Sequence, residues 1–418
     1  QEVTQVFTPY LMENRTERTG REKKLEREIA MMNNRLAAHL FYWYWPMAPY
    51  PVEEGAVVDE FDESAPLFIV LGGGGGSGAS LAGGESGSTG CSFMSRLLFE
   101  SGPVVLSRDD EQQEGMVLKE RQISEQLTRT WNRLGHVLYI DAPVMTGYSY
   151  VEMKEVKKGK SSIPFADGIP KRAQLAALDL YFALDEFMTL YPRLNSSSIY
   201  FVTSEYESKT VLYLNQILKT IKSVDGVNSL ANVQLMGNVL FDPILYPSIQ
   251  YPTIVPYNYM RGTLSYGDTV RLSQTVQACL SETQSDKIVN CESFFTQATR
   301  SHTVDARDSR IIEQYRDLGQ LLLSYMNDSL VLDTLQVKAG RFQGVCNTMV
   351  YDALKYDMHT DVPHSLLPEL MDTYNVPFLF SSDQFNMRSN SKGVQEMLRS
   401  VPWSGRQQFN SQKATALT

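Results

Sequence analysis

Short apolar runs alternate along the chain with longer segments whose apolar residues have helical spacing. The clearest pair spans residues 199–218. The apolar run Ile199 to Val202 predicts a strand, and after a polar turn five spaced apolar residues predict a helix: Val211, Leu212, Leu214, Ile217 and Leu218. Further buried strands are predicted within 66–71, 131–150, 233–243 and 376–386. Residues 173–191 predict an amphipathic helix with one apolar face made of Leu175, Leu178, Phe182 and Phe187.

Three segments depart from this alternation. Residues 1 to about 30 are polar, with a charged run from Arg15 to Arg27, and residues 28–36 have helical character; a solvated arm is expected, or an arm that docks on a partner. His39 to Trp45 is rich in aromatic residues and predicts buried sheet rather than a ligand platform. Gly72 to Gly90 is rich in glycine, but it contains no Walker lysine and no GxGxxG opening a helix, so a flexible loop is favoured over a nucleotide site.

Composition excludes several classes of function. The 418 residues suit one large α/β sheet with an insertion, and 43% apolar content is ample for a core. The net charge of −10 argues against nucleic acid as a partner. No apolar run approaches the roughly 18 residues needed to span a bilayer, so no transmembrane segment is expected. No cofactor-binding or metal-binding motif is apparent, and none is predicted.

Cysteines and asparagine triplets leave alternatives open. The four cysteines, Cys91, Cys279, Cys291 and Cys346, have no CxxC spacing, and an even number fits reduced core thiols as well as two disulfides. Glycosylation triplets begin at Asn14, Asn195 and Asn327. A chain of this length produces two or three such triplets by chance, so they only permit glycosylation.

The turn at 203–208 carries the most informative motif. Its sequence is Thr-Ser-Glu-Tyr-Glu-Ser, and a strand, a sharp turn and a helix in this order are the setting of a nucleophile elbow. It resembles the Gly-Glu-Ser-Tyr-Ala-Gly elbow of the serine carboxypeptidase family. The family's patterns are also resembled by Gly90 to Pro103, by residues 131–150 nearly residue for residue, and by residues 233–243. The resemblance covers roughly residues 39 to 405.

This resemblance implies an α/β-hydrolase fold, with a central mostly parallel sheet flanked by helices and a helical cap insertion. It divides the chain into an N-terminal arm (1–38), a core segment (39–243, with the glycine-rich insertion 72–90), a cap (244–335) and the C-terminal part of the core (336–418). The family's last strands are expected to be truncated.

The same comparison implies that the catalytic groups are replaced. Glu205 falls at the nucleophile position and Asn386 at the aspartate position, whereas the two elbow glycines become Thr203 and Ser208. The family's Gly-Gly-His-Met-Val-Pro motif has no counterpart in these 418 residues; His136, His302, His359 and His364 match no catalytic position. The family's oxyanion loop is opened by the glycine-rich insertion, and Glu100 is retained for structural hydrogen bonds. Thr203, in place of glycine, is expected to strain the turn.

Residue by residue, the resemblance also implies the disulfides Cys91–Cys346 and Cys279–Cys291. Disulfides indicate an oxidising compartment: the lumen of the secretory pathway, a vacuole or lysosome-like organelle, or the extracellular space, with the mitochondrial intermembrane space as an alternative.

Three functions follow as hypotheses. The favoured one is a catalytically inactive serine-carboxypeptidase-like protein that serves as a structural or accessory subunit of a larger assembly with other protein subunits. The second is a pseudoenzyme that binds a peptide or a small acidic ligand in the former active site. The third is an altered serine hydrolase that uses Ser204 or Ser208, which with Tyr206 flank the old position, and Glu205 as a general base.

Overall fold

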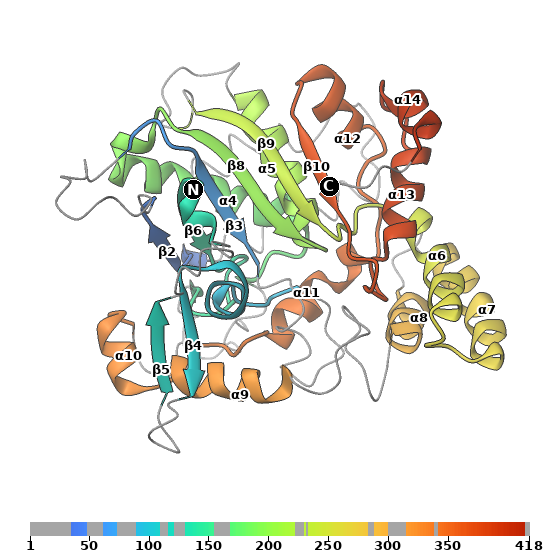
Figure 1. Ribbon diagram of the computed structural model, residues 1–418, viewed down its shortest axis with the longest axis horizontal. Helices are drawn as coiled ribbons and strands as arrows, with labels where there is room; N and C mark the ends of the chain where they lie inside the picture. The colour runs from blue at the N-terminus through green and yellow to red at the C-terminus, as the bar shows by residue number, and fades with distance from the viewer. Residues whose placement is uncertain are drawn as a thin grey trace, which may run out of the picture.

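The computed structural model describes residues 35–47, 62–72, 89–108, 116–120, 130–153, 168–221, 230, 233–282, 288–299, 315–337 and 342–413. At its centre is a six-stranded sheet in the order β10-β9-β8-β3-β6-β2 (Figure 1). Its strands are β2 (Tyr42–Trp45), β3 (Leu67–Leu71), β6 (His136–Ile140), β8 (Ser198–Ser204), β9 (Gln234–Phe241) and β10 (Phe378–Ser381). All neighbouring pairs are parallel except β2–β6. The predicted mostly parallel sheet is therefore confirmed.

Both faces of this sheet are covered, as its parallel strands require. Alternate residues of a strand point to opposite faces, and β3 divides accordingly: Leu67, Ile69 and Leu71 belong to one hydrophobic cluster, whereas Phe68 and Val70 belong to another. The first cluster contains the helices α4 (Ala173–Leu190) and α5 (Glu207–Ile221). The second contains the π-helical turn η1 (Arg96–Ser101) and residues of α9 (Tyr315–Met326) and α10 (Ser329–Thr334).

The helices of residues 244–335 separate into two groups (Figure 1). Helices α6 (Pro247–Met260), α7 (Tyr266–Glu282) and α8 (Val289–Thr299) lie at one side of the molecule, far from α9 and α10. They build a third hydrophobic cluster, which also takes in Tyr206 of the elbow and α11 (Thr348–Met358). Because α9 and α10 instead complete the sheet's second face, the two groups stand on different parts of the core.

Two small antiparallel pairs lie outside the main sheet: β1 (Arg35–His39) with β7 (Tyr150–Met153), and β4 (Val104–Arg108) with β5 (Met116–Glu120). The remaining elements are short turns and the C-terminal helices: η2 (Trp131–Arg133), η4 (Pro192–Leu194), α12 (Leu366–Pro368), η6 (Glu369–Thr373), α13 (Ser391–Ser400) and α14 (Arg406–Ser411).

Most predicted elements are confirmed, and three local expectations are wrong. Arg35 and Leu36 belong to strand β1 rather than to a helix, because they lie along β7. The aromatic segment 39–45 is broken between β1 and β2, and β2 is a half-buried edge strand instead of fully buried sheet. Phe182 is 37% exposed, since α4 buries the neighbouring positions Leu180, Tyr181 and Leu184.

Both implied disulfides are present, Cys91–Cys346 and Cys279–Cys291. The first joins the segment after the glycine-rich insertion to the segment immediately before α11. The second joins α7 to α8. In the described residues no cysteine is free.

Candidate active site

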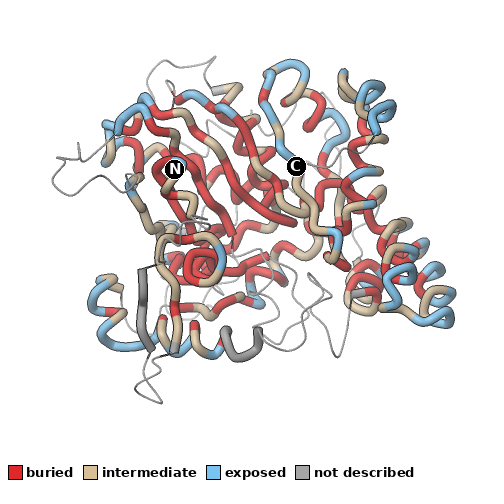
Figure 2. The backbone as a smooth tube through the Cα atoms, in the orientation of Figure 1, coloured by how far each residue is buried: buried red, intermediate tan, exposed pale blue. Residues whose placement is uncertain are grey.

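The elbow is a tight turn between β8, which ends at Ser204, and α5, which begins at Glu207. Glu205 lies at its apex with φ 44° and is 3% exposed, and the end of β8 that leads into it is buried (Figure 2). Its backbone N–H donates to Phe241 O (2.9 Å), and its carbonyl accepts from the N–H of Ile244 (3.1 Å) and Ser208 (3.3 Å). The left-handed backbone of a non-glycine residue costs on the order of 1–2 kcal/mol, and these bonds hold it.

The strain in the elbow falls at a different residue from the one expected. Thr203 is a regular member of β8, paired with Leu240 of β9, so the prediction of strain at Thr203 is wrong. Thr203 still fits because its side chain is buried at the end of a strand, where no special backbone conformation is needed. The strain is carried by Glu205, the residue that the family resemblance places at the nucleophile position.

Three hydroxyl groups surround this turn without hydrogen-bond partners in the described part of the chain. They belong to Thr203, Ser204 and Ser208, and each is at most 3% exposed. A nucleophilic serine needs a base within hydrogen-bond reach. In the part of the chain that the structure describes, no residue hydrogen-bonds to the hydroxyl of Ser204 or Ser208.

Asn386 and Glu205 are brought together through Asp242, a residue that the sequence did not single out. The Asn386 side chain hydrogen-bonds to the Asp242 carboxyl, while its oxygen accepts from the N–H of Arg388 (2.8 Å) and Ser389 (3.0 Å). Burial, with a contribution from the charge of Glu205, raises the pKa of Asp242 to about 7. The signal for Asp242 was available, because it ends the strand motif 233–243.

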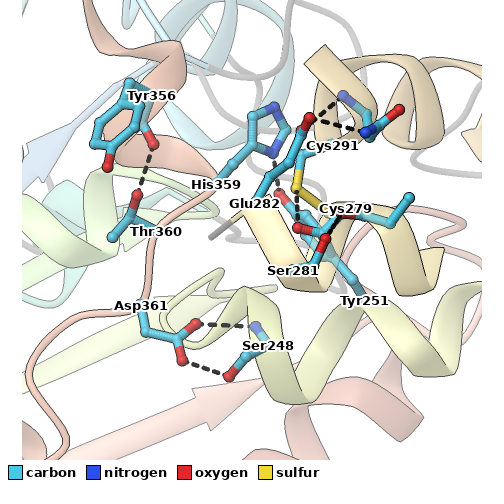
Figure 3. Close-up of a disulfide and its surroundings, with 12 residues drawn as sticks. Ser248, Tyr251, Cys279, Ser281, Glu282, Cys291, Tyr356, His359, Thr360 and Asp361 are labelled. Atoms are coloured by element: carbon cyan, nitrogen blue, oxygen red, sulfur yellow. Dashed lines mark hydrogen bonds between the residues drawn. A yellow bond between two sulfur atoms is a disulfide. The ribbon is translucent and has the colours of Figure 1, made fainter. Parts of the chain in front are cut away.

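The described histidines have contacts of their own. His359 is fully buried beside the Cys279–Cys291 disulfide, where its Nδ1 bonds the Tyr251 hydroxyl (2.7 Å); its Nε2 has no hydrogen-bond partner in the part that the structure describes (Figure 3). His136 bonds Tyr44 and Asp62, and His364 lies at the surface beside Asp361. His302 lies outside the described residues.

A buried lysine of the elbow helix was also missed. Lys209 is 1% exposed, and its ammonium donates to the carbonyls of Asp357 (2.7 Å), Met358 (3.1 Å) and Thr360 (2.5 Å) at the end of α11. Beside it, the Tyr206 hydroxyl donates to Asp357 Oδ2 (2.8 Å). Burial lowers the pKa of Lys209 to about 8. The sequence gives no signal for this contact because it joins residues about 150 positions apart.

A second buried carboxyl joins the two segments that match the family best. Asp141 accepts hydrogen bonds from Ser92 Oγ (2.7 Å) and from the N–H groups of Phe93 (3.0 Å) and Tyr148 (3.1 Å). Gly147 leaves room for it, since a side chain there would collide with the carboxyl. Burial raises the pKa of Asp141 to about 7.

The pKa shifts of the buried groups Asp141, Asp242 and His359 predict that the protein becomes more stable as the pH falls from 8 to 5. Asp141 and Asp242 keep protons in the folded state that the unfolded chain releases above pH 4, so the stability present at low pH is lost as the pH rises through 7. His359 opposes this, because burial holds its pKa near 3 and stability is lost as the pH falls below 6.5. The combined effect of the two carboxyls is larger than that of the one imidazole. The free energy of unfolding is therefore expected to rise by on the order of 3 kcal/mol from pH 8 to pH 5.

Denaturant unfolding at pH 5, 6.5 and 8, at constant ionic strength and with disulfides intact, measures this dependence. Asp242→Asn, which removes one of the two groups, should flatten it. A wild-type protein that loses stability between pH 8 and pH 5 contradicts the prediction.

Other predicted positions have structural surroundings. Glu100 forms an ion pair with Arg96 across one helical turn (3.6 Å), while the structural hydrogen bonds expected for it stay a prediction. Asn195 is half-buried and Asn327 is exposed, whereas Asn14 and residues 73–88 of the glycine-rich insertion lie outside the described residues. At the near end of that insertion, the Glu207 side chain packs against Gly72.

Within the described ranges, no cluster of three or more His, Cys, Asp or Glu residues is placed to hold a metal ion. The described helices also include none that is long and apolar enough to cross a membrane.

Comparisons with known proteins agree with this architecture. The sequence pattern of the serine carboxypeptidase family matches residues 86–417. The pheromone-processing carboxypeptidase kex1 of Aspergillus clavatus is 25% identical over 344 residues, which cover 77% of this chain and 51% of that protein. Serine carboxypeptidase S10 family member 1 of Dictyostelium discoideum is 21% identical over 345 residues, covering 78% and 73% of the two chains.

Among solved structures, the prohormone-processing carboxypeptidase Kex1(delta)p of Saccharomyces cerevisiae superposes with a TM-score of 0.62 at 16% identity. The superposition covers 88% of this chain and 77% of the other. This likeness shows the α/β-hydrolase fold. The chain spans about half the length of the kex1 carboxypeptidases that it matches.

Proposed function

Because the chain belongs to the serine carboxypeptidase family, we propose that it keeps the family's scaffold without its peptide-hydrolysing chemistry and serves as a structural or accessory subunit of a protein assembly. The observation that carries this proposal is Glu205 at the apex of the elbow, buried and with φ 44°. A carboxylate at that apex has no hydroxyl to form an acyl ester, and its negative charge would repel a developing oxyanion.

The surroundings of Glu205 support the loss of acyl transfer. Asn386, at the position of the family's aspartate, has its amide engaged with Asp242 and with a local turn, so it does not orient a histidine in the described part of the chain. The hydroxyls of Ser204 and Ser208 have no described partner that could accept their protons. These replacements affect the nucleophile and the group that orients its base, and a triad needs all of its members together.

A fluorophosphonate probe tests the proposal directly. No covalent labelling of the wild-type protein is expected, and Glu205→Ser should remain unlabelled because Asn386 cannot orient a base for the new hydroxyl as an aspartate would. A serine carboxypeptidase that reacts with the probe is the positive control. Labelling of the wild-type chain that disappears in Ser204→Ala would overturn the proposal and identify an altered hydrolase.

A subunit role is supported by apolar side chains at the outer end of the helices α6 and α7. Tyr259, Met260, Tyr266 and Val270, here called the α6–α7 surface, are 46%, 75%, 72% and 48% exposed. Large apolar side chains gathered within a short stretch at a surface are typical of protein contacts. Subunits of an assembly therefore fit this end of the molecule.

The native mass of protein gently extracted from its source distinguishes an assembly from a free protein. We expect a large particle of defined composition, whereas a species with the mass of a single chain would contradict the subunit role. To test the N-terminal arm as a docking element, residues 1–34 should be deleted rather than 1–38, because Arg35–His39 forms β1. An assembly that survives this deletion would remove the arm from the proposal.

A ligand-binding role for the former active site is a second candidate, favoured by the three buried hydroxyls without described partners. The charge of Glu205 disfavours the small acidic ligand considered from the sequence, which leaves a peptide as the better fit. A ligand specific to the folded state raises the melting temperature, so thermal-shift screening with neutral peptides and with small acidic ligands separates the two candidates.

The proposed location is the secretory pathway, either its lumen, a vacuole-like compartment or the exterior, with the mitochondrial intermembrane space as the alternative. Its support is the pair of disulfides, which persist in oxidising compartments.

A further inference from the structure

The corner between α9 and α10 presents a complete glycosylation triplet to solvent. Asn327, Asp328 and Ser329 are all exposed, as is the following Leu330. We propose that Asn327 carries an N-linked glycan and that Asn195 does not. The inference rests on the secretory location proposed above.

Asn195 lies in a different environment although it has the same triplet. The residue is half-buried, and its side-chain oxygen is inaccessible to solvent. The third residue of that triplet, Ser197, is fully buried, and its hydroxyl donates to Glu63 O (3.4 Å). A bulky, solvated glycan needs an amide at the open surface, and a sugar at Asn195 would displace this packed turn.

At Asn327 the folded structure accommodates the modification without losing a contact. Its Nδ2 donates to Leu323 O (2.8 Å), one turn earlier in α9. In the transfer, Nδ2 forms a bond to C1 of the first sugar of a lipid-diphosphate-linked oligosaccharide. The C1–O bond to the diphosphate breaks, one amide proton is released and the lipid diphosphate leaves. The modified amide keeps one N–H, which can still donate to Leu323.

The leucines beside Asn327 give a physical reason for a glycan at this corner. Leu323 is 36% exposed and Leu330 is 74% exposed, and they lie four residues before and three residues after the asparagine. A glycan attached between them would cover apolar side chains that otherwise promote nonspecific association. Helices α9 and α10 lie far from α6–α8 (Figure 1), so the glycan would leave the α6–α7 surface open.

Expression of the full chain behind a cleavable secretion signal in a eukaryotic cell tests the inference independently of the native location. Glycopeptide mass spectrometry should find a glycan at Asn327. Asn327→Gln and Ser329→Ala should each lower the apparent mass on a gel by the mass of one glycan. Asn195→Gln should leave the apparent mass unchanged. An unmodified Asn327 in secreted, disulfide-bonded protein overturns the inference, and so does a glycan at Asn195.

The native location is tested separately, because protein from its source that has free thiols and no glycan at all contradicts the secretory location. The secreted protein then still reports on the choice between the two asparagines.

Discussion

Replacing both Cys91 and Cys346 with serine is expected to lower the free energy of unfolding by about 5 kcal/mol. The reason is the length of chain that this disulfide closes, since its cysteines are 255 residues apart. A bridge over so many residues removes much of the conformational entropy of the unfolded chain. It also fixes the segment of Ser92, whose hydroxyl and neighbouring N–H bind Asp141.

The second disulfide is the matched control. Cys279 and Cys291 are only 12 residues apart, so replacing both with serine should cost about 3 kcal/mol on the same entropic reasoning. Denaturant unfolding of the two double variants and the wild type, under conditions that block thiol exchange, gives the comparison. An equal or larger loss from the 12-residue bridge would contradict it; failure of the Cys91→Ser, Cys346→Ser variant alone to fold would agree with it.

Lys209→Met is expected to destabilise the protein by on the order of 3–5 kcal/mol. The methionine fills similar space, but the carbonyls of Asp357, Met358 and Thr360 lose their buried donor. Buried polar groups without partners cost more than the lost bonds would suggest, because water does not reach them to replace the donor.

Lys219→Met, at a half-exposed lysine of the same helix, is the control and should change stability by less than about 0.5 kcal/mol. Denaturation midpoints of the two variants at pH 6.5, where Lys209 is charged, measure the difference. Equal midpoints would mean that the ammonium of Lys209 contributes little beyond its volume.

The strands and helices around the elbow could be predicted because their signals are local. Ile199 to Val202 is an apolar run long enough only for a strand, and the apolar residues of 211–218 repeat at helical spacing. The structure accordingly has β8 and α5 at these places. The disulfides needed more than this, since spacing alone left four cysteines equally compatible with free thiols, and the family resemblance supplied the pairs.

What could not be predicted depends on contacts between distant segments. Lys209 reads as an ordinary polar residue on a helix, and only the end of α11 makes it a buried donor. The raised pKa of Asp242 comes from its burial and from the charge of Glu205, which lies in another part of the sequence. Likewise, no local pattern separates α6–α8 from α9 and α10, because the apolar residues of each helix do not specify which cluster they join.

The elbow is held by the backbone of Glu205 rather than by its side chain. Its N–H and C=O bond Phe241, Ile244 and Ser208, and any residue other than proline supplies the same two groups. These bonds therefore do not depend on the side chain at the apex, although the left-handed backbone there favours glycine. An elbow held in this way keeps its shape through main-chain contacts, whatever chemistry its apex side chain performs.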